Sequence, residues 1–227
     1  MSNEIFSKVD TYISSLLGKE RQALKESIKL IEQSNIPNAS VSANQGKFLQ
    51  VLALICNAKR ILELGTLGAY STIWLADALP GNGKVISIES DPLNYEVAIK
   101  NIYNAGLESK VEIRLGKALD ILPEIAKEQK EPFDMIFIDA DKPPYTEYVQ
   151  WAIKLGRPGT VIVADNVIRN GMVLDPNITD EKVLGVQRLN AMLENCSEVT
   201  ATILQNVGVK EYDGMVLAVI NRTENNI

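Results

Sequence analysis

Two acidic residues each follow directly after a short apolar run of the chain. Asp139 closes the run MIFI, and Asp165 with Asn166 closes the run VIVA. In open α/β sheets, ligands bind outside the carboxyl ends of the strands. Two carboxylates and an amide provide only oxygen ligands, which suits a hard divalent cation, Mg²⁺ first and Mn²⁺ or Ca²⁺ as alternatives. Lys142, three residues after Asp139, adds a group that can accept a proton.

Each acid alone would also suit a loop start or a helix N-cap, where aspartate is common. The two acids together, with a lysine beside one of them, favour a site over two unrelated caps.

A glycine-containing turn, ELGTLGAYS over residues 63–71, follows an earlier apolar run. It has neither the spacing of a dinucleotide-binding loop nor the lysine of a P-loop. Glu63 precedes Gly65, and a carboxylate there would repel a pyrophosphate but attract a sulfonium or ammonium group. This charge pattern favours S-adenosylmethionine (SAM) over NAD. An ordinary strand-to-helix turn is the alternative.

Further along, Glu89 ends the second apolar run. An acid about 20 residues beyond such a loop can hold the ribose hydroxyls of either ligand. Ala118 follows the third run, where the adenine of the same ligand would reach.

Five short apolar runs alternate with helical patterns, which predicts a mainly parallel sheet covered on both faces. Two more runs near the end, joined by a short turn, should be antiparallel. The expected strands are 60–64, 84–88, 111–115, 133–138, 160–164, 199–205 and 214–221, and the expected helices after the first 40 residues are 42–56, 70–79, 92–104, 117–130, 144–155 and 181–195. The sequence therefore predicts an α/β, Rossmann-like, seven-stranded sheet in one domain over residues 1–227. Residues 1–40 are expected to form an N-terminal helical arm of this domain.

Composition narrows the possible functions. The 227 residues carry a formal net charge of −6, which argues against broad nucleic-acid binding. The chain has no histidine and two distant cysteines, so Ser-His-Asp catalysis, Cys-His catalysis and the usual zinc sites are excluded. No apolar run approaches the roughly 20 residues of a membrane span, and the N-terminus lacks the pattern of a signal peptide. We therefore expect a cytoplasmic protein that does not associate with membranes.

Three motifs together resemble those of the cation-dependent, SAM-dependent O-methyltransferases of the caffeoyl-CoA and catechol type. They are ELGTLGAYS at 63–71, FIDADK at 137–142 and ADNV at 164–167. The resemblance spans about Val41 to Ile220 and implies a class I methyltransferase fold. Two departures stand out: Ala69 replaces a glycine common in the family, and residues 210–212 lengthen a turn near the acceptor side.

The resemblance also implies a role for each matching residue. Asp139, Asp165 and Asn166 would bind the cation, and Lys142 would act as the general base. The positions that would contact the cofactor are Val41, Glu63, Gly65, Thr66, Ser71, Glu89, Ala118 and Asp139. Relatives of this kind are mostly dimers, so a homodimer is expected.

The expected activity is methyl transfer from SAM to a hydroxyl of a catechol-like small molecule, a phenolic acceptor. The alternative is a tRNA hydroxyuridine O-methyltransferase, which the acidic composition disfavours. A third possibility, a SAM-binding module without catalysis, would not need the cation site. Segment 167–176 and the N-terminal helices are candidates for lining the acceptor site, although plain packing would explain both.

Overall fold

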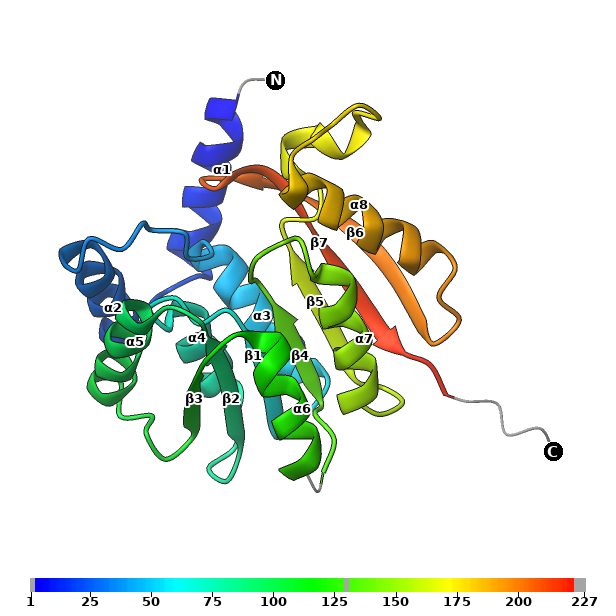
Figure 1. The fold of residues 1–227 in the computed structure, drawn as a ribbon. Helices are drawn as coiled ribbons and strands as arrows, with labels where there is room; N and C mark the ends of the chain where they lie inside the picture. Colours follow the sequence, from blue (N-terminus) through cyan, green and yellow to red (C-terminus); the bar gives the residue numbers. More distant parts are fainter. Residues whose placement is uncertain (1–2, 129–130, 223–227) are drawn as a thin grey trace.

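Strands and helices alternate along most of the chain in the computed structural model, which describes residues 3–128 and 131–222 (Figure 1). The strands are β1 (Arg60–Leu64), β2 (Lys84–Glu89), β3 (Val111–Leu115), β4 (Met135–Ile138), β5 (Val161–Asp165), β6 (Val199–Gly208) and β7 (Glu211–Ile220). The helices are α1 (Asn3–Leu16), α2 (Gln22–Gln33), α3 (Ala43–Ile55), α4 (Tyr70–Ala78), α5 (Pro92–Asn104), α6 (Ala118–Glu128), α7 (Tyr145–Leu155) and α8 (Glu181–Glu194). The helix predicted over residues 117–130 includes residues 129–130 at its end, and these two lie outside the described residues.

The seven strands form one sheet in the order β3-β2-β1-β4-β5-β7-β6. All pairs from β3 to β5 are parallel, whereas β7 is antiparallel to both β5 and β6. The predicted architecture, a mostly parallel sheet finished by an antiparallel hairpin, is confirmed. From β1 the chain adds β2 and β3 on one side of the sheet and then returns to add β4 and β5 on the other side. Ligands of open α/β sheets bind at the switch point between two such halves, which here lies between β1 and β4.

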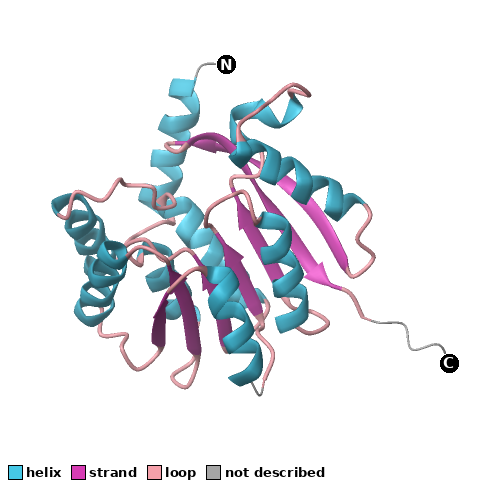
Figure 2. Ribbon diagram, viewed as in Figure 1, coloured by secondary structure: helices cyan, strands magenta, loops and turns pink. Residues whose placement is uncertain are grey.

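Helices cover both faces of the sheet (Figure 2). Alternate residues of each central strand enter opposite cores: Met135 and Phe137 of β4 pack with Trp74 of α4, whereas Ile136 and Ile138 pack with Val149 of α7. Because both faces are buried, the central strands read as continuous apolar runs rather than alternating ones. This double burial is why the acids at the strand ends stand out in the sequence.

The N-terminal arm consists of two helices. α1 packs beside β6 at the far edge of the sheet, and α2 lies near α5 at the other side (Figure 1). Ser42 forms a capping box with Gln45 at the start of α3, which sets where the arm ends and the first covering helix begins. Among the described residues, no helix has the length and apolar character needed to cross a membrane.

The C-terminal hairpin is longer than expected. Glu211 and Tyr212 belong to β7, where they pair with Gly208 and Val207 of β6. The interpretation that residues 210–212 lengthen the turn is therefore wrong, and the turn itself is tight. Glu211 adopts a left-handed backbone with φ of 68°, a conformation for which glycine is the usual signal.

The segment after Asn166 is not an open loop along its whole length. Residues Arg169–Leu174, η1, have 3-10 character interrupted by a kink, where Asn170 and Gly171 adopt left-handed conformations. The Asp213 carboxylate accepts hydrogen bonds from the backbone N–H groups of Ile168 and Arg169, both at 2.9 Å. These bonds tie the start of the segment to β7.

Candidate functional site

The register of the sheet brings three predicted site residues to one level. Leu64 of β1 pairs with Ile138 of β4, and Ile138 pairs with Ala164 of β5. The next residues along the chain, Gly65, Asp139 and Asp165, therefore lie side by side at the carboxyl ends of these strands. The convergence expected from the two apolar runs is thus a consequence of parallel pairing in register.

Gly65 makes this close arrangement possible. Its φ of 95° lies in the left-handed region, and a Cβ atom at this position would collide with the backbone carbonyl of Asp139. The Asp139 N–H in turn donates to the Leu64 carbonyl at 2.8 Å. Only glycine allows the chain to leave β1 this close to the end of β4.

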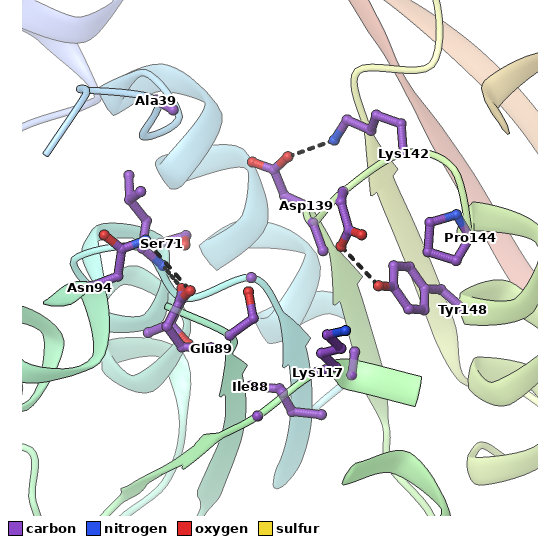
Figure 3. Close-up of a pocket in the computed structure, with 18 of the residues that line it drawn as sticks. Ala39, Ser71, Ile88, Glu89, Asn94, Lys117, Asp139, Lys142, Pro144 and Tyr148 are labelled. Carbon is purple, nitrogen blue, oxygen red and sulfur yellow. Dashed lines mark hydrogen bonds and ion pairs between the residues drawn. The ribbon is translucent and has the colours of Figure 1, made fainter. Parts of the chain in front are cut away.

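A cavity of about 820 Å³ opens at these strand ends. The connections that follow β1 and β4 both contribute to its lining, and Figure 3 shows Asp139 and Lys142 from the second of them. The predicted cofactor and catalytic residues that line it are Val41, Gly65, Thr66, Ser71, Glu89, Ala118, Asp139, Lys142 and Asn166. The volume falls within the range of about 300–1,000 Å³ typical of small-molecule sites.

Glu63 does not line this cavity. Its side chain is fully buried behind the glycine turn and accepts hydrogen bonds from the hydroxyls of Ser71, Thr72 and Ser87. Burial raises the pKa of the Glu63 carboxyl to about 7, opposed by these three hydroxyls, while the charge of Asp139 raises it further. Glu63 therefore lies behind the cavity wall and holds the Ser71 side chain in place through this hydrogen bond.

Glu89 lies at the end of β2, where a ribose-binding acid is expected. One carboxylate oxygen accepts from the Leu67 N–H at 2.7 Å, and the other accepts from the Asp91 N–H at 2.8 Å. Figure 3 shows Glu89 among the residues that line the cavity. These bonds fix the carboxylate at the cavity wall, and they also fix the glycine turn through Leu67.

The turn itself carries backbone strain. Leu67 and Ala69 both adopt positive φ, 49° and 67°. Ala69 stands where the family often has glycine, so the departure seen in the sequence falls at a left-handed position. A non-glycine residue in this region costs roughly 1–2 kcal/mol.

A second cavity of about 420 Å³ adjoins the first. Asp165 lines this second cavity, whereas Val41, Asp139 and Asn166 line both. Its other walls come from the N-terminal arm and the C-terminal hairpin, including Asp10 and Lys210. The three predicted cation ligands therefore stand at the junction of two cavities.

The donor set fits a hard dication. Among the described residues no three His, Cys, Asp or Glu side chains gather as a metal cluster, so the candidate set is two carboxylates and the Asn166 amide. Burial, followed by the charge of Asp139, raises the pKa of the Asp165 carboxyl above its usual range, whereas Lys142 lowers it. Two crowded carboxylates of this kind are stabilised by a bound cation.

Lys142 is buried beside Asp139. Its Nζ donates to Asp139 Oδ1 at 3.0 Å and to the Tyr145 hydroxyl at 2.5 Å. The Lys142–Pro143 backbone lies against Gly185 of α8, where a Cβ atom would collide with the Lys142 carbonyl. The lysine is thus held from its side chain and from its backbone.

Tyr145 is a site residue that sequence reasoning missed. Its ring is fully buried, and its hydroxyl donates to the Asp165 carbonyl oxygen at 2.9 Å. Burial, followed by the charges of Asp139 and Asp165, raises the pKa of Tyr145 well above its usual value, so the phenol stays protonated. The Lys-x-x-Tyr spacing at the start of a helix was the available signal.

Comparison with known proteins gives consistent matches. A family model described as O-methyltransferase matches residues 13–220. The catechol O-methyltransferase of Niastella koreensis is 62% identical over 220 residues, which cover 97% of this chain and 100% of the relative.

Solved structures agree with this match. The O-methyltransferase TomG from Streptomyces achromogenes, in complex with SAM, has a TM-score of 0.94 and 47% identity, and the alignment covers 98% of this chain and 100% of TomG. The O-methyltransferase from Bacillus cereus, in complex with SAH, has a TM-score of 0.94 and 45% identity over 97% of this chain and 100% of that chain.

Proposed function

The chain belongs to the O-methyltransferase family, and we propose that it transfers the methyl group of SAM to one hydroxyl of a catechol-like small molecule with the help of a divalent cation. SAM-dependent O-methyl transfer follows from the family and from neighbours that bind SAM or SAH. The acceptor class and the cation are inferred from the site. The observation that carries both is that Asp139 and Asn166 line both cavities, while Asp165 lines the smaller one and Lys142 the larger one beside them.

We assign the larger cavity to SAM. Glu89 is positioned for the ribose hydroxyls and Ala118 for the adenine, while Val41, Gly65, Thr66 and Ser71 surround the place of the methionine portion. Asp139 faces the same cavity and supplies the negative charge that an ammonium group requires. Glu63 acts indirectly, by holding Ser71 through its carboxylate.

Asp139, Asp165 and Asn166 would hold the cation, with Mg²⁺ as the expected metal and Mn²⁺ or Ca²⁺ as alternatives. When bound, a dication lowers the pKa of a chelated catechol hydroxyl and fixes both hydroxyls of the acceptor.

Lys142 completes the reaction on the protein side. In its neutral form, its Nζ accepts the proton of the acceptor hydroxyl. The oxygen then forms a bond to the methyl carbon while the carbon–sulfur bond breaks, and the neutral thioether leaves. The contribution of the site is to align oxygen, carbon and sulfur on one line.

The smaller cavity is assigned to the acceptor. Its volume of about 420 Å³ suits a single aromatic ring with substituents. The net charge of −6 supports a small molecule over a nucleic acid, because RNA binding needs a cationic surface. The tRNA alternative gains no observation of its own from the site.

A turnover assay tests this function. With SAM, Mg²⁺ and a panel of catechols, the protein should methylate at least one vicinal diol and none of the matching monophenols. EDTA should reduce turnover at least about 100-fold while SAM binding, measured by calorimetry, stays within about threefold. Full turnover in EDTA, after exhaustive dialysis against it, would defeat the cation-dependent proposal.

A further inference from the structure

We propose that Tyr145 is a positioning residue for methyl transfer, whose hydroxyl ties Lys142 to the ends of β4 and β5. This inference rests on the proposed function, in which Lys142 takes the proton of the acceptor. It adds a residue with no direct contact to the acceptor, cofactor or cation in the assignments above.

The hydroxyl of Tyr145 has three polar neighbours. It accepts from Lys142 Nζ at 2.5 Å, donates to the Asp165 carbonyl oxygen at 2.9 Å, and lies 3.3 Å from the Ile138 carbonyl oxygen. Asp165 is a candidate cation ligand, and Ile138 immediately precedes another, Asp139. One phenolic oxygen therefore connects the lysine with the backbone of both strands that carry carboxylate ligands.

A lysine needs such a tie because its four-carbon stem is flexible and its ammonium is a compact point charge. The other side-chain partner of Nζ is Asp139, whose oxygens are also assigned to the cation. Tyr145 is the remaining anchor: its ring centroid lies 4.5 Å from Nζ, in addition to the hydrogen bond. A shift of the lysine by about 1 Å can cost on the order of 100-fold in rate.

The anchor is itself rigid. Tyr145 is the first residue of α7 and is fully buried, with its ring 6.2 Å from that of Tyr148. Phenylalanine would fill the same space and remove only the hydroxyl. Tyr145→Phe therefore isolates the proposed role from the packing of the core.

The experiment compares Tyr145→Phe with a matched control, Thr160→Val. The Thr160 hydroxyl is also fully buried and bonds to backbone, donating to the Phe133 carbonyl at 2.6 Å, but it lies at the opposite end of β4 and β5. We expect Tyr145→Phe to lower kcat by roughly 10- to 100-fold while the Kd for SAM and for Mn²⁺ stay within about threefold. Thr160→Val should lower Tm about as much as Tyr145→Phe does, because each removes one buried hydroxyl, but it should leave kcat within about twofold.

A double-mutant cycle with Lys142→Met separates positioning from general damage. If Tyr145 acts through Lys142, adding Tyr145→Phe to the Lys142→Met protein should change the residual kcat less than about twofold. An additional loss as large as in the wild-type background would overturn the assignment. So would a kcat of Tyr145→Phe that matches wild type.

A third measurement does not depend on turnover. Lys142 is 6% exposed, and without its anchor its Nζ should react several-fold faster with acetic anhydride, as followed by peptide mass spectrometry. Equal labelling in wild type and Tyr145→Phe would contradict the role of the hydroxyl. A protein that methylates no catechol would defeat the proposed function, and the labelling result would still decide this inference.

Discussion

At the residue scale, Glu63 is a carboxyl group whose ionisation is coupled to folding. It is fully buried, and its pKa of about 7 in the folded chain exceeds its ordinary value of 4.5. Between these two pH values the folded chain keeps a proton that the unfolded chain has released. The stabilisation from Glu63 is therefore complete below about pH 4.5 and is lost as pH rises through about 7.

Replacing Glu63 by glutamine should remove this dependence. From pH 5 to pH 8 we expect the free energy of unfolding of wild type to fall relative to that of Glu63→Gln by on the order of 2 kcal/mol. Urea denaturation followed by circular dichroism at four pH values would measure the difference. Parallel profiles for the two proteins would refute it, and Glu96→Gln, an exposed substitution on α5, serves as the control.

Sequence reasoning located Glu89, Asp139 and Asp165 because each comes at the end of an apolar run. Tyr145 could not be found in this way. Its partners include two backbone carbonyls from strands that are distant in sequence, and backbone groups leave no mark on residue type. Glu63 was expected at the cofactor, and its position behind the wall depends on the hydroxyls of three residues that fold around it.

At the element scale, the turn between β1 and α4 is constrained at two points. It holds the Glu89 carboxylate through Leu67 and approaches the end of β4 through Gly65. Both contacts require the chain to follow one path. A change at Gly65 should therefore affect the loop and Asp139 together.

Gly65→Ala should lower the free energy of unfolding by at least about 2 kcal/mol, because alanine disfavours the left-handed conformation and its methyl group meets the Asp139 carbonyl. Affinity for SAM should fall at least about 100-fold, since the loop must shift away from its backbone position. Thermal unfolding and calorimetric SAM titration would measure the two effects. Gly81→Ala is the matched control, because nothing lies within 4 Å of its added methyl group. Retention of wild-type SAM affinity in Gly65→Ala would contradict the constraint.

The alternation of strands and helices could be predicted from apolar periodicity, and so could the antiparallel ending. The exact position of the turn between β6 and β7 could not be predicted. Its left-handed residue is Glu211, whereas a glycine there would have marked the turn in the sequence. The 3-10 helix η1 was likewise hidden, because its short length and left-handed residues give no helical period.

At the scale of the whole molecule, α1 has one face joined to the C-terminal hairpin and one face left exposed. One face carries Asp10, which accepts from the Val209 N–H at 3.1 Å and joins the arm to the hairpin turn. The other face carries Ile5, Val9, Tyr12 and Leu16, which are 44–63% exposed. Their spacing of four, three and four residues places them on one stripe. Neither the docking of α1 on β6 nor the open stripe follows from local sequence, because both depend on contacts between the two ends of the chain.

An apolar stripe of this kind supports the homodimer proposed from the family resemblance, since exposed apolar patches mark association surfaces. We expect a mass of twice 25.0 kDa in light scattering coupled to gel filtration. Tyr12→Glu with Leu16→Glu should give the mass of one chain, because a carboxylate buried at an interface costs several kcal/mol. Thr11→Glu adds one such carboxylate away from the stripe and should leave the dimer intact. Each stripe substitution is therefore also made singly, so that Tyr12→Glu and Thr11→Glu carry the same added charge. A dimer that survives both stripe substitutions would place the interface elsewhere, and a wild-type mass of 25.0 kDa would exclude the dimer altogether.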